Sequence, residues 1–333
     1  MTNETRILKF ENAPKIILTS SVVGPKEGDG PLGKYFENVL SDDRVKEKTF
    51  EKAERKILSF VLDEISTKLK KRGENLDVIV GGDLLNQLTT TSFAAREMHV
   101  PLLGLYSACS TMSEALLVGS VLVDGGYVKN AAACSVSHFS SAERQYRFPL
   151  EQGTQRPPVS QWTVTGAGAC LLKLSEEKLP KITRALIGKV EDYGITDVNN
   201  MGAAMAPAAA STLCDFFENS GELPENYDLV LTGDLGVLGS SILVDLMKDR
   251  GYDISKVHDD TGAMIYEKSP DKFQGGSGAG CSASVLSSYI YQKLCGVEIK
   301  RMLFLATGAL LSTTSSQQGE SIPGISHLVE IEV

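Results

Sequence analysis

The chain has 333 residues, 42% of them apolar and 23% charged, and this ordinary balance excludes a disordered or fibrous protein. With 33 basic against 42 acidic residues the net charge is −9, the opposite of what a protein that binds nucleic acid needs. No apolar stretch approaches the ~20 residues that cross a bilayer, and the N-terminus lacks the apolar core of a signal peptide. We therefore expect a soluble chain of cytoplasmic type that binds no nucleic acid.

The first half predicts alternating helices and strands. Apolar residues recur at helical spacing over residues 50–69, and a short apolar run over 76–80 predicts a buried strand. We then expect a helix over 90–98, a strand over 102–106, a third helix ending near 123 and a strand over 131–136. Such alternation favours mostly parallel sheets with helices on both faces. Residues 152–158 and 199–210 are predicted to be loops.

The second half repeats motifs of the first. The run Asp-Val-Ile-Val-Gly-Gly-Asp-Leu at 77–84 matches Asp-Leu-Val-Leu-Thr-Gly-Asp-Leu at 228–235, with four identical positions. Ala-Cys-Ser at 108–110 and Gly-Cys-Ser at 280–282 each precede an apolar helical run. The repeat predicts two similar halves, 1–175 and 176–333, that form one compact body with the layers α/β/α/β/α. Two separate domains are less favoured, because no linker divides the halves.

Cys109 lies where the predicted strand over 102–106 turns into the following helix. A thiol at a helix N-terminus is favoured as the thiolate, which predicts a nucleophile. The alternative is a small core residue, as most single cysteines are. The six cysteines form no C-x-x-C pair and have no histidine at zinc spacing, so we expect reduced thiols and no protein-bound metal.

Asp83 and Asp234 each follow an apolar strand through a glycine. Ligands of open α/β sheets bind beyond the carboxyl ends of strands, so the two aspartates are candidates for one shared site. They are equally candidates for helix caps. Asn86 adds an amide in the same region.

His258 precedes two aspartates in the sequence His-Asp-Asp. This histidine is a candidate base or a hydrogen-bond donor to a ligand carboxylate, and a solvated loop is the alternative. The glycine-rich run at 275–280 offers a backbone cradle for a ligand or, equally, close packing between the halves. Arg144 and Arg147 are candidates for carboxylate clamps or for surface ion pairs.

The duplicated halves and the cysteine at the first strand-to-helix turn resemble the thiolase superfamily, which includes the β-ketoacyl-acyl-carrier-protein synthases. Within it, the chain resembles most the stage V sporulation AD family of spore-forming bacteria. The segments that carry this resemblance are 24–33, 82–87, 108–111, 142–145, 194–197, 205–209, 258–260 and 306–312.

The resemblance implies that a condensing enzyme would need a histidine, or a histidine and an asparagine, beside its cysteine. In this chain Gly233-Asp234-Leu235 and Gly276-Ser277-Gly278 stand at those places, so only Cys109 matches the catalytic pattern. The alternative is a condensing enzyme of the β-ketoacyl-acyl-carrier-protein synthase III type that uses Cys109 as acyl acceptor with non-standard partners, or a scaffold with a vestigial pocket.

The sporulation family implies binding of dipicolinate, or of its calcium chelate, for uptake into the developing spore. It also implies membrane proteins of the same operon as partners, and the resemblance to the thiolase superfamily implies a homodimer formed through the sheet edge beside the cysteine helix. We expect no cofactor other than calcium carried by the ligand. The predicted site residues are Asp83, Asn86, Cys109, Asp234 and His258, with Cys109 at the floor of a pocket and the aspartates on opposite walls.

Overall fold

A thirteen-stranded sheet runs through the whole molecule. The computed structural model describes residues 6–146, 156–267 and 274–333, and its main strands follow the order β11-β10-β13-β15-β9-β2-β8-β6-β4-β5. The strands of the first part are β2 (Lys15–Val23), β4 (Val78–Gly82), β5 (Leu102–Gly104), β6 (Ala131–Ser137) and β8 (Gly166–Lys173). Those of the second part are β9 (Lys181–Leu186), β10 (Leu229–Gly233), β11 (His258–Asp260), β13 (Arg301–Ala309) and β15 (Leu328–Glu332).

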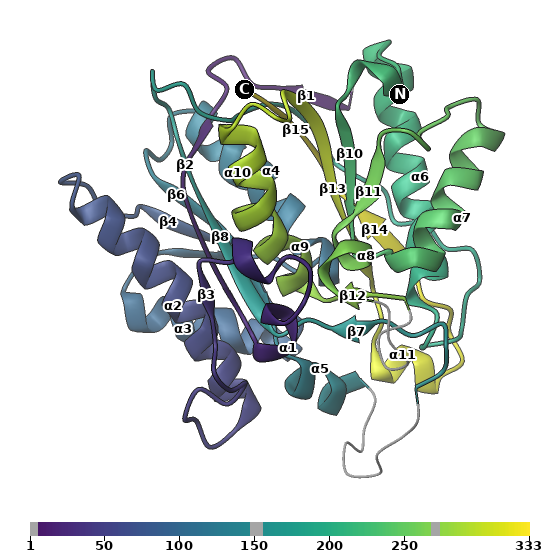
Figure 1. Cartoon of the computed structure of the whole chain (residues 1–333), viewed down its shortest axis with the longest axis horizontal. Coiled ribbons are helices and arrows are strands. Elements are labelled where there is room, and N and C mark those ends of the chain that lie inside the picture. Colours follow the sequence, from purple (N-terminus) through teal and green to yellow (C-terminus); the bar gives the residue numbers. More distant parts are fainter. Residues whose placement is uncertain (1–5, 147–155, 268–273) are drawn as a thin grey trace.

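Shorter strands complete the sheets. β1 (Ile7–Lys9), β3 (Asn38–Val39) and β14 (Gly324–Ser326) pair with β9, β2 and β13, respectively. A separate two-stranded sheet pairs β7 (Trp162–Thr163) with β12 (Gly276–Ser277). This small sheet lies low in the view of Figure 1, near the middle of the molecule.

The pairing pattern of the first part is repeated in the second. β2–β8 and β8–β6 are antiparallel, and β6–β4 and β4–β5 are parallel. In the same order, β9–β15 and β15–β13 are antiparallel, and β13–β10 and β10–β11 are parallel. The expectation of mostly parallel sheets is therefore wrong for half of these pairings. A strand that helices cover on both faces is a continuous apolar run whether its neighbours are parallel or antiparallel. The sequence pattern therefore did not distinguish parallel from antiparallel pairing.

Helices form three of the five layers. α2 (Phe50–Lys70) and α3 (Thr89–Met98) cover the outer face of the first sheet part, and α6 (Met201–Ser220) and α7 (Gly236–Asp249) cover that of the second. α4 (Thr111–Asp124) and α9 (Ala279–Val285) lie between the two parts. Figure 1 shows this central pair of helices flanked by the sheets. The predicted α/β/α/β/α fold is confirmed.

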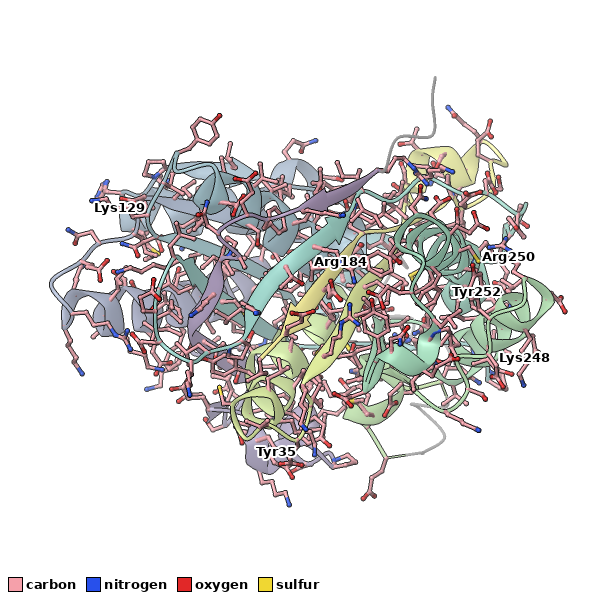
Figure 2. All side chains as sticks on the ribbon, turned by 90° about the horizontal axis from the view of Figure 1, so that it is seen from above. Tyr35, Lys129, Arg184, Lys248, Arg250 and Tyr252 are labelled. Atoms are coloured by element: carbon pink, nitrogen blue, oxygen red, sulfur yellow. The ribbon has the colours of Figure 1, made fainter. Side chains whose placement is uncertain are left out.

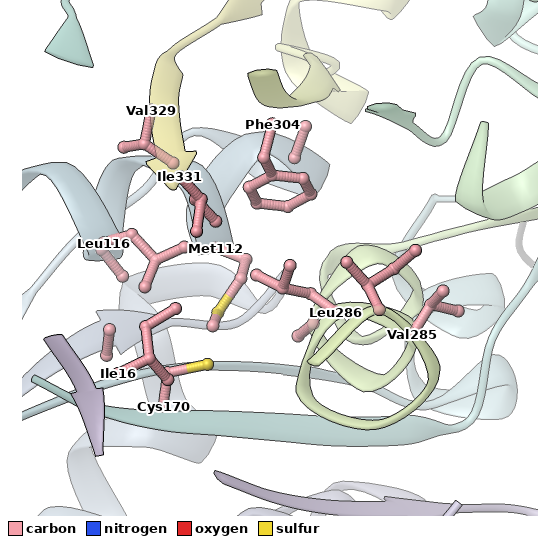
Figure 3. Packing of buried hydrophobic residues seen from close by; sticks show 14 of the residues in the cluster. Ile16, Met112, Leu116, Cys170, Val285, Leu286, Phe304, Val329 and Ile331 are labelled. Atoms are coloured by element: carbon pink, nitrogen blue, oxygen red, sulfur yellow. The ribbon is translucent and has the colours of Figure 1, made fainter. Parts of the chain in front are cut away.

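The central layer contains a large hydrophobic core to which both halves contribute. Met112 and Leu116 of α4 lie between the sheet parts (Figure 3). The other labelled side chains come from both parts of the sheet, from the end of α9 and from the π-helical turn after it: Ile16, Cys170, Val285, Leu286, Phe304, Val329 and Ile331. Each large apolar side chain buried in this way contributes roughly 1.5–3 kcal/mol, so the halves stabilise one another.

The predicted loop over 199–210 is wrong, because most of it is the first half of helix α6. Asn200 caps this helix by accepting a hydrogen bond from the Ala203 N–H at 3.4 Å. The segment is rich in alanine, which has the highest helix propensity, and Pro207 is accommodated inside the helix although proline usually interrupts one. The other predicted loop, 152–158, lies largely outside the described residues.

Strands β9 and β15 lie in the middle of the molecule when it is seen from above, with Lys129 toward one end and Lys248, Arg250 and Tyr252 toward the other (Figure 2). The labelled Arg184 of β9 donates to the fully buried carboxylate of Glu330 on β15 at 2.8 Å, and Arg301 pairs with the same group. In the described part of the chain, no helix is both long and apolar enough to cross a membrane.

Candidate functional site

Cys109 lies on a tight turn at the start of the central helix α4. The turn is a 3-10 segment, Ala108–Ser110, and Ala108 has a left-handed φ of 50°. The Ser110 N–H donates to the Ser107 carbonyl at 2.9 Å, and the Thr111 hydroxyl donates to the Ala108 carbonyl at 2.7 Å. The turn places the half-buried Cys109 directly before the helix, as the sequence predicted.

A narrow cavity of about 60 Å³ opens beside Cys109. Its lining combines apolar side chains with residues that carry polar atoms. The apolar side chains are Leu84, Ala108, Ala142, Met201, Met205, Ala309 and Leu311. The polar lining comes from Cys109, Glu143, Tyr146, Thr163, Ser277 and Gly278. The lining residues come from both halves of the chain, so the cavity exists only once the halves have packed.

Most of the polar lining residues belong to the small β7–β12 sheet and to helix α5 (Phe139–Tyr146). Thr163 and Ser277 are register partners in that sheet. The Thr163 hydroxyl lies 3.5 Å from Glu143 Oε1. One carboxylate and two hydroxyl groups are therefore among the groups that line the cavity.

Arg156 positions Glu143. Its Nη2 lies 2.7 Å from Glu143 Oε1, and its Nη1 donates to the Gln161 carbonyl at 2.7 Å. The guanidinium also lies 5.1 and 4.9 Å from the ring centres of Phe139 and Trp162, which stack with each other at 3.9 Å. Ion pair, hydrogen bond and cation–π contacts together hold this arginine in one orientation.

A second, wider hollow of about 370 Å³ adjoins the cavity and shares Tyr146 and Leu311 with it. Asn86 lies in this outer groove and is exposed, and its backbone N–H donates to the Gln145 side chain at 3.0 Å. Of the five predicted site residues, the structure therefore brings together Cys109 and Asn86, which lie in adjoining hollows.

Asp83 is not a wall of this cavity. Its fully buried carboxylate accepts hydrogen bonds from the Leu85 N–H at 2.9 Å and from the Thr91 N–H and hydroxyl at 2.8 and 2.6 Å. Burial raises the pKa of Asp83, and the hydrogen bonds from Thr91 and Leu85 lower it. The carboxylate thus stabilises the turn between β4 and α3, which was the structural alternative.

Asp234 is also absent from the cavity lining. It follows β10 with a left-handed φ of 75°, and its side chain is fully buried. Neither carboxyl oxygen has a hydrogen-bond partner among the described residues. Burial, and next the charge of Asp260, raise the pKa of Asp234 well above its usual value, because burial favours the uncharged form of a carboxyl group.

His258 belongs to strand β11 and not to a loop. Its Nε2 lies 2.9 Å from the Thr232 hydroxyl of the neighbouring strand, and burial lowers its pKa to about 4. Asp260, two residues after His258, caps helix α8 (Thr261–Ile265) by accepting a hydrogen bond from the Ala263 N–H at 3.0 Å. The predicted arrangement with Asp83, Asp234 and His258 around Cys109 is therefore not the observed one. Hydrogen bonds from Thr91 hold Asp83, the Thr232 hydroxyl contacts His258, and Asp234 is fully buried outside the cavity lining.

Glu143, Thr163 and Ser277 line the cavity but were not predicted. Helical spacing offers the signal that was missed: in α5, Ala142, Glu143 and Tyr146 share the face toward the cavity, since residues three and four apart lie on one side of a helix. The neighbouring Arg144 points away and pairs with Glu51 at 3.2 Å, which was the structural alternative. Arg147 lies outside the described residues.

The glycine run after residue 274 packs closely between the halves, as one of its two predicted roles required, and one of its glycines also lines the cavity. Gly278 has φ 106° and lines the cavity. At Gly280 an added Cβ would collide with the Gly166 carbonyl. The absence of a side chain at Gly280 therefore allows α9 to approach β8 closely. His327, near the C-terminus, lies 3.2 Å from the hydroxyl of Ser107, two residues before Cys109.

Solved condensing enzymes share this fold. The chain superimposes on 3-oxoacyl-[acyl-carrier-protein] synthase III from Aquifex aeolicus VF5 with a TM-score of 0.55 and 14% identity, over 96% of this chain and 100% of that one. A variant of OleA from Xanthomonas campestris with bound cerulenin gives a TM-score of 0.59 and 12% identity, over 99% of each chain. The fold is therefore that of the thiolase-like condensing enzymes.

The sequence gives a narrower relationship. The family of stage V sporulation protein AD matches residues 4–332. Stage V sporulation protein AD of Bacillus subtilis (strain 168) is 42% identical over 326 residues, which are 97% of this chain and 95% of that protein. The chain belongs to the stage V sporulation protein AD family.

Proposed function

We propose that the chain is a binding protein and not an enzyme, and that its ligand is dipicolinate (pyridine-2,6-dicarboxylate) in the form of its calcium chelate. The observation that carries the proposal is the mixed lining of the cavity at Cys109. Its apolar side chains suit the flat face of an aromatic ring, and its carboxylate and hydroxyl oxygens suit the polar edge of a metal chelate. The proposed role is uptake of this ligand into the developing spore, within the sporulation process after which the family is named.

The residues around Cys109 support binding over carbon–carbon bond formation. A condensing reaction needs groups that stabilise the oxyanion of the thioester and assist decarboxylation. The described residues that line the cavity include neither a histidine nor an asparagine. The family resemblance puts Gly233-Asp234-Leu235 and Gly276-Ser277-Gly278 at the places of those groups, and neither stretch contains an imidazole or an amide side chain.

The narrow inner space implies how the ligand lies. We expect it to span the cavity and the outer groove through the gap beside Tyr146 and Leu311, which line both. Asn86 then lies at the outer end of the ligand. The Tyr146 hydroxyl, 3.0 Å from that of Tyr106, forms part of the passage between the two hollows.

Calorimetry of the full chain with dipicolinate, with and without calcium, tests the proposal. We expect saturable binding of the chelate that Cys109→Trp abolishes, because the larger side chain fills the cavity. The matched control is Cys295→Trp, an exposed cysteine at the end of helix α10 (Tyr291–Cys295), which should bind as the wild type does. Equal binding by both variants, or loss of binding in His258→Ala, would place the ligand elsewhere.

The second candidate function is acyl transfer, and the position of Cys109 at the N-terminus of α4 favours it, because a helix N-terminus stabilises a thiolate. Mass spectrometry of the intact protein after incubation with acyl-coenzyme A separates the two functions. We expect no stable adduct on Cys109. An acyl adduct that turns over in the presence of a malonyl thioester would establish a condensing enzyme instead.

We further propose that the chain acts at the spore inner membrane through membrane proteins of its operon. Vesicle flotation tests this part of the proposal. The isolated chain should stay in the lower fraction and float only with vesicles that contain those partners, whereas flotation with protein-free vesicles would show direct lipid binding.

A further inference from the structure

A third hollow, of about 490 Å³, shares no lining residue with the Cys109 cavity or with the outer groove. We call it the β2 hollow. The first half lines it with β2, the stretch before β3 and helix α2, and the second half lines it with the π-helical turn Leu286–Ile290 and the start of α10. Tyr35, one of its lining residues, lies at the margin of the molecule in Figure 2. The size of this hollow suits a small organic ligand, and π-helical turns are frequent at functional sites.

The hydroxyl groups that the second half brings to the β2 hollow have already donated their hydrogens. The Ser288 hydroxyl donates to the Ser284 carbonyl at 2.6 Å, and the Tyr291 hydroxyl donates to the Ile16 carbonyl at 3.0 Å. A hydroxyl group has one hydrogen, so each of these oxygens has only lone pairs left for a ligand. The two side chains therefore favour a ligand that donates hydrogen bonds.

Lys68, which also lines the β2 hollow, has no hydrogen left for a ligand. Its Nζ donates to the Thr19 carbonyl at 3.4 Å and lies 2.7 Å from Glu37 Oε1 and 3.2 Å from Glu64 Oε1, and an ammonium group has three hydrogens. Burial raises the pKa of Glu37, Lys68 lowers it, and Glu64 raises it further. Two carboxylates thus share one lysine, which leaves one excess negative charge beside the hollow and favours a cation there.

Aromatic rings form another part of the lining, contributed by Tyr35, Phe36 and Tyr291. The face of such a ring attracts an ammonium group. The exposed Lys34 already makes this contact, because its Nζ lies 5.0 Å from the centre of the Tyr35 ring. A ligand that carries a positive charge would therefore compete with Lys34 for the ring, whereas an anion would meet the excess carboxylate and the hydroxyl lone pairs.

We propose that the β2 hollow is a second ligand site, which binds an organic ammonium group carried on a short apolar stem. Glu37 supplies the opposite charge, and the oxygens of Ser288 and Tyr291 accept hydrogen bonds from the ammonium group. The aromatic rings and Ile17 contact the stem. This site is independent of the proposed function at Cys109, because the two share no residue.

Ligand-observed NMR titration of the full chain tests the proposal with three probes that have the same stem. Butylammonium carries the positive charge, 1-butanol carries none, and butyrate carries a negative charge. We expect saturable binding of butylammonium, weaker binding of 1-butanol and no binding of butyrate, because the hollow offers a carboxylate and hydrogen-bond acceptors to the polar end of each probe.

Three exposed residues of the lining supply the variants, so each is expected to fold, and the melting temperature checks this. Glu37→Gln should weaken butylammonium binding by about fivefold, the scale of a partly exposed ion pair. Gln292→Trp should abolish it by filling the hollow. Lys34→Gln should strengthen it, because a competing positive charge is removed. Glu47→Gln is the matched control, since Glu47 pairs with a lysine outside the hollow, and it should bind as the wild type does.

Binding of butyrate in place of butylammonium, or loss of butylammonium binding in Lys34→Gln, would overturn the proposal, because the hollow would then attract anions. Unchanged binding in both Glu37→Gln and Gln292→Trp would also overturn it by placing the ammonium group elsewhere. Two more probes identify the natural source and agree with the site in either order. Tighter binding of spermidine than of Nα-acetyl-lysine methylamide would indicate a free polyamine, and the reverse order would indicate a lysine side chain of another protein.

Discussion

At the scale of single residues, the buried carboxyl groups are the most unusual feature of the molecule. Burial raises the pKa of Asp260 to about 6, and raises the pKa values of Glu54 and Asp234 well above their usual range. Glu54 accepts a hydrogen bond from the Ser141 hydroxyl through one oxygen, and its other oxygen has no partner among the described residues. Burial favours the uncharged form of such groups, so their contribution to stability depends on pH.

The variant Asp234→Asn tests this pH dependence at a carboxyl group whose two oxygens accept no hydrogen bond from the described residues. The pKa of Asp234 is higher in the folded than in the unfolded chain, so its contribution is fully present below its unfolded value of 3.8 and is lost as pH rises toward the folded value. The wild-type free energy of unfolding should therefore fall with pH more steeply than that of the variant. The difference is at most about 1.4 kcal/mol per pH unit.

Urea denaturation at pH 5 and pH 7 measures the two slopes. Asp245→Asn, on the exposed surface of helix α7, is the control and should keep the wild-type slope. Identical slopes in the wild type and Asp234→Asn would show that Asp234 is already ionised in the folded chain.

At the scale of elements, helix α9 determines whether the cavity forms. Its first residues follow Gly278, which lines the cavity, and its seven residues are all buried. The helix lies against β8 with no room for a side chain at Gly280, because Gly166 of that strand approaches it directly. The position of α9 between the two halves therefore also determines the shape of the cavity beside Cys109.

Gly280→Ala should destabilise the protein by about 3 kcal/mol or more, because the new methyl group overlaps the Gly166 carbonyl and either the helix or the strand must shift. Gly296→Ala is the matched control. The nearest atom to its added methyl group lies 3.3 Å away, so the neighbouring carbonyl has only to give by a few tenths of an ångström. Thermal unfolding compares the two, and an equal melting temperature for Gly280→Ala and wild type would contradict the close packing described for α9.

At the scale of the whole molecule, the sheet ends at an open strand. In the described part of the chain β5 pairs only with β4, and Leu103 and Tyr106 beside it are 43% and 44% exposed. Phe93 of the adjacent helix α3 is 40% exposed. An unprotected strand edge with apolar side chains is a template for pairing with another chain, which supports the expectation of a homodimer formed here.

Leu103→Asp should convert the predicted dimer to a monomer, because it places a charge on the edge where two strands would pair. Val190→Asp, at a site 58% exposed on the other half of the chain, is the control and should leave the association unchanged. Sedimentation equilibrium distinguishes these outcomes, and a dimer that persists in Leu103→Asp would place the interface elsewhere.

The sequence by itself determined the local structure of the first half and the layered fold. Helices α2 and α3 and strands β4 and β6 begin and end within two residues of their predicted limits, and α4 ends within one residue of its predicted end. Apolar periodicity and turn residues are local signals, so they can be recognised in a single chain. The turn at Cys109 could be predicted for the same reason, because the strand, the turn and the helix that form it are adjacent in the sequence.

Only the tertiary structure decided which polar groups meet at the cavity. Asp83, Asp234 and His258 had the expected positions along the chain, but hydrogen bonding, burial and strand pairing turned them away from Cys109. Glu143, Thr163 and Ser277 come from three segments distant from Cys109 in the sequence. Their proximity depends on the register of β7 with β12 and on the packing of the halves, and neither is encoded in the residues next to them.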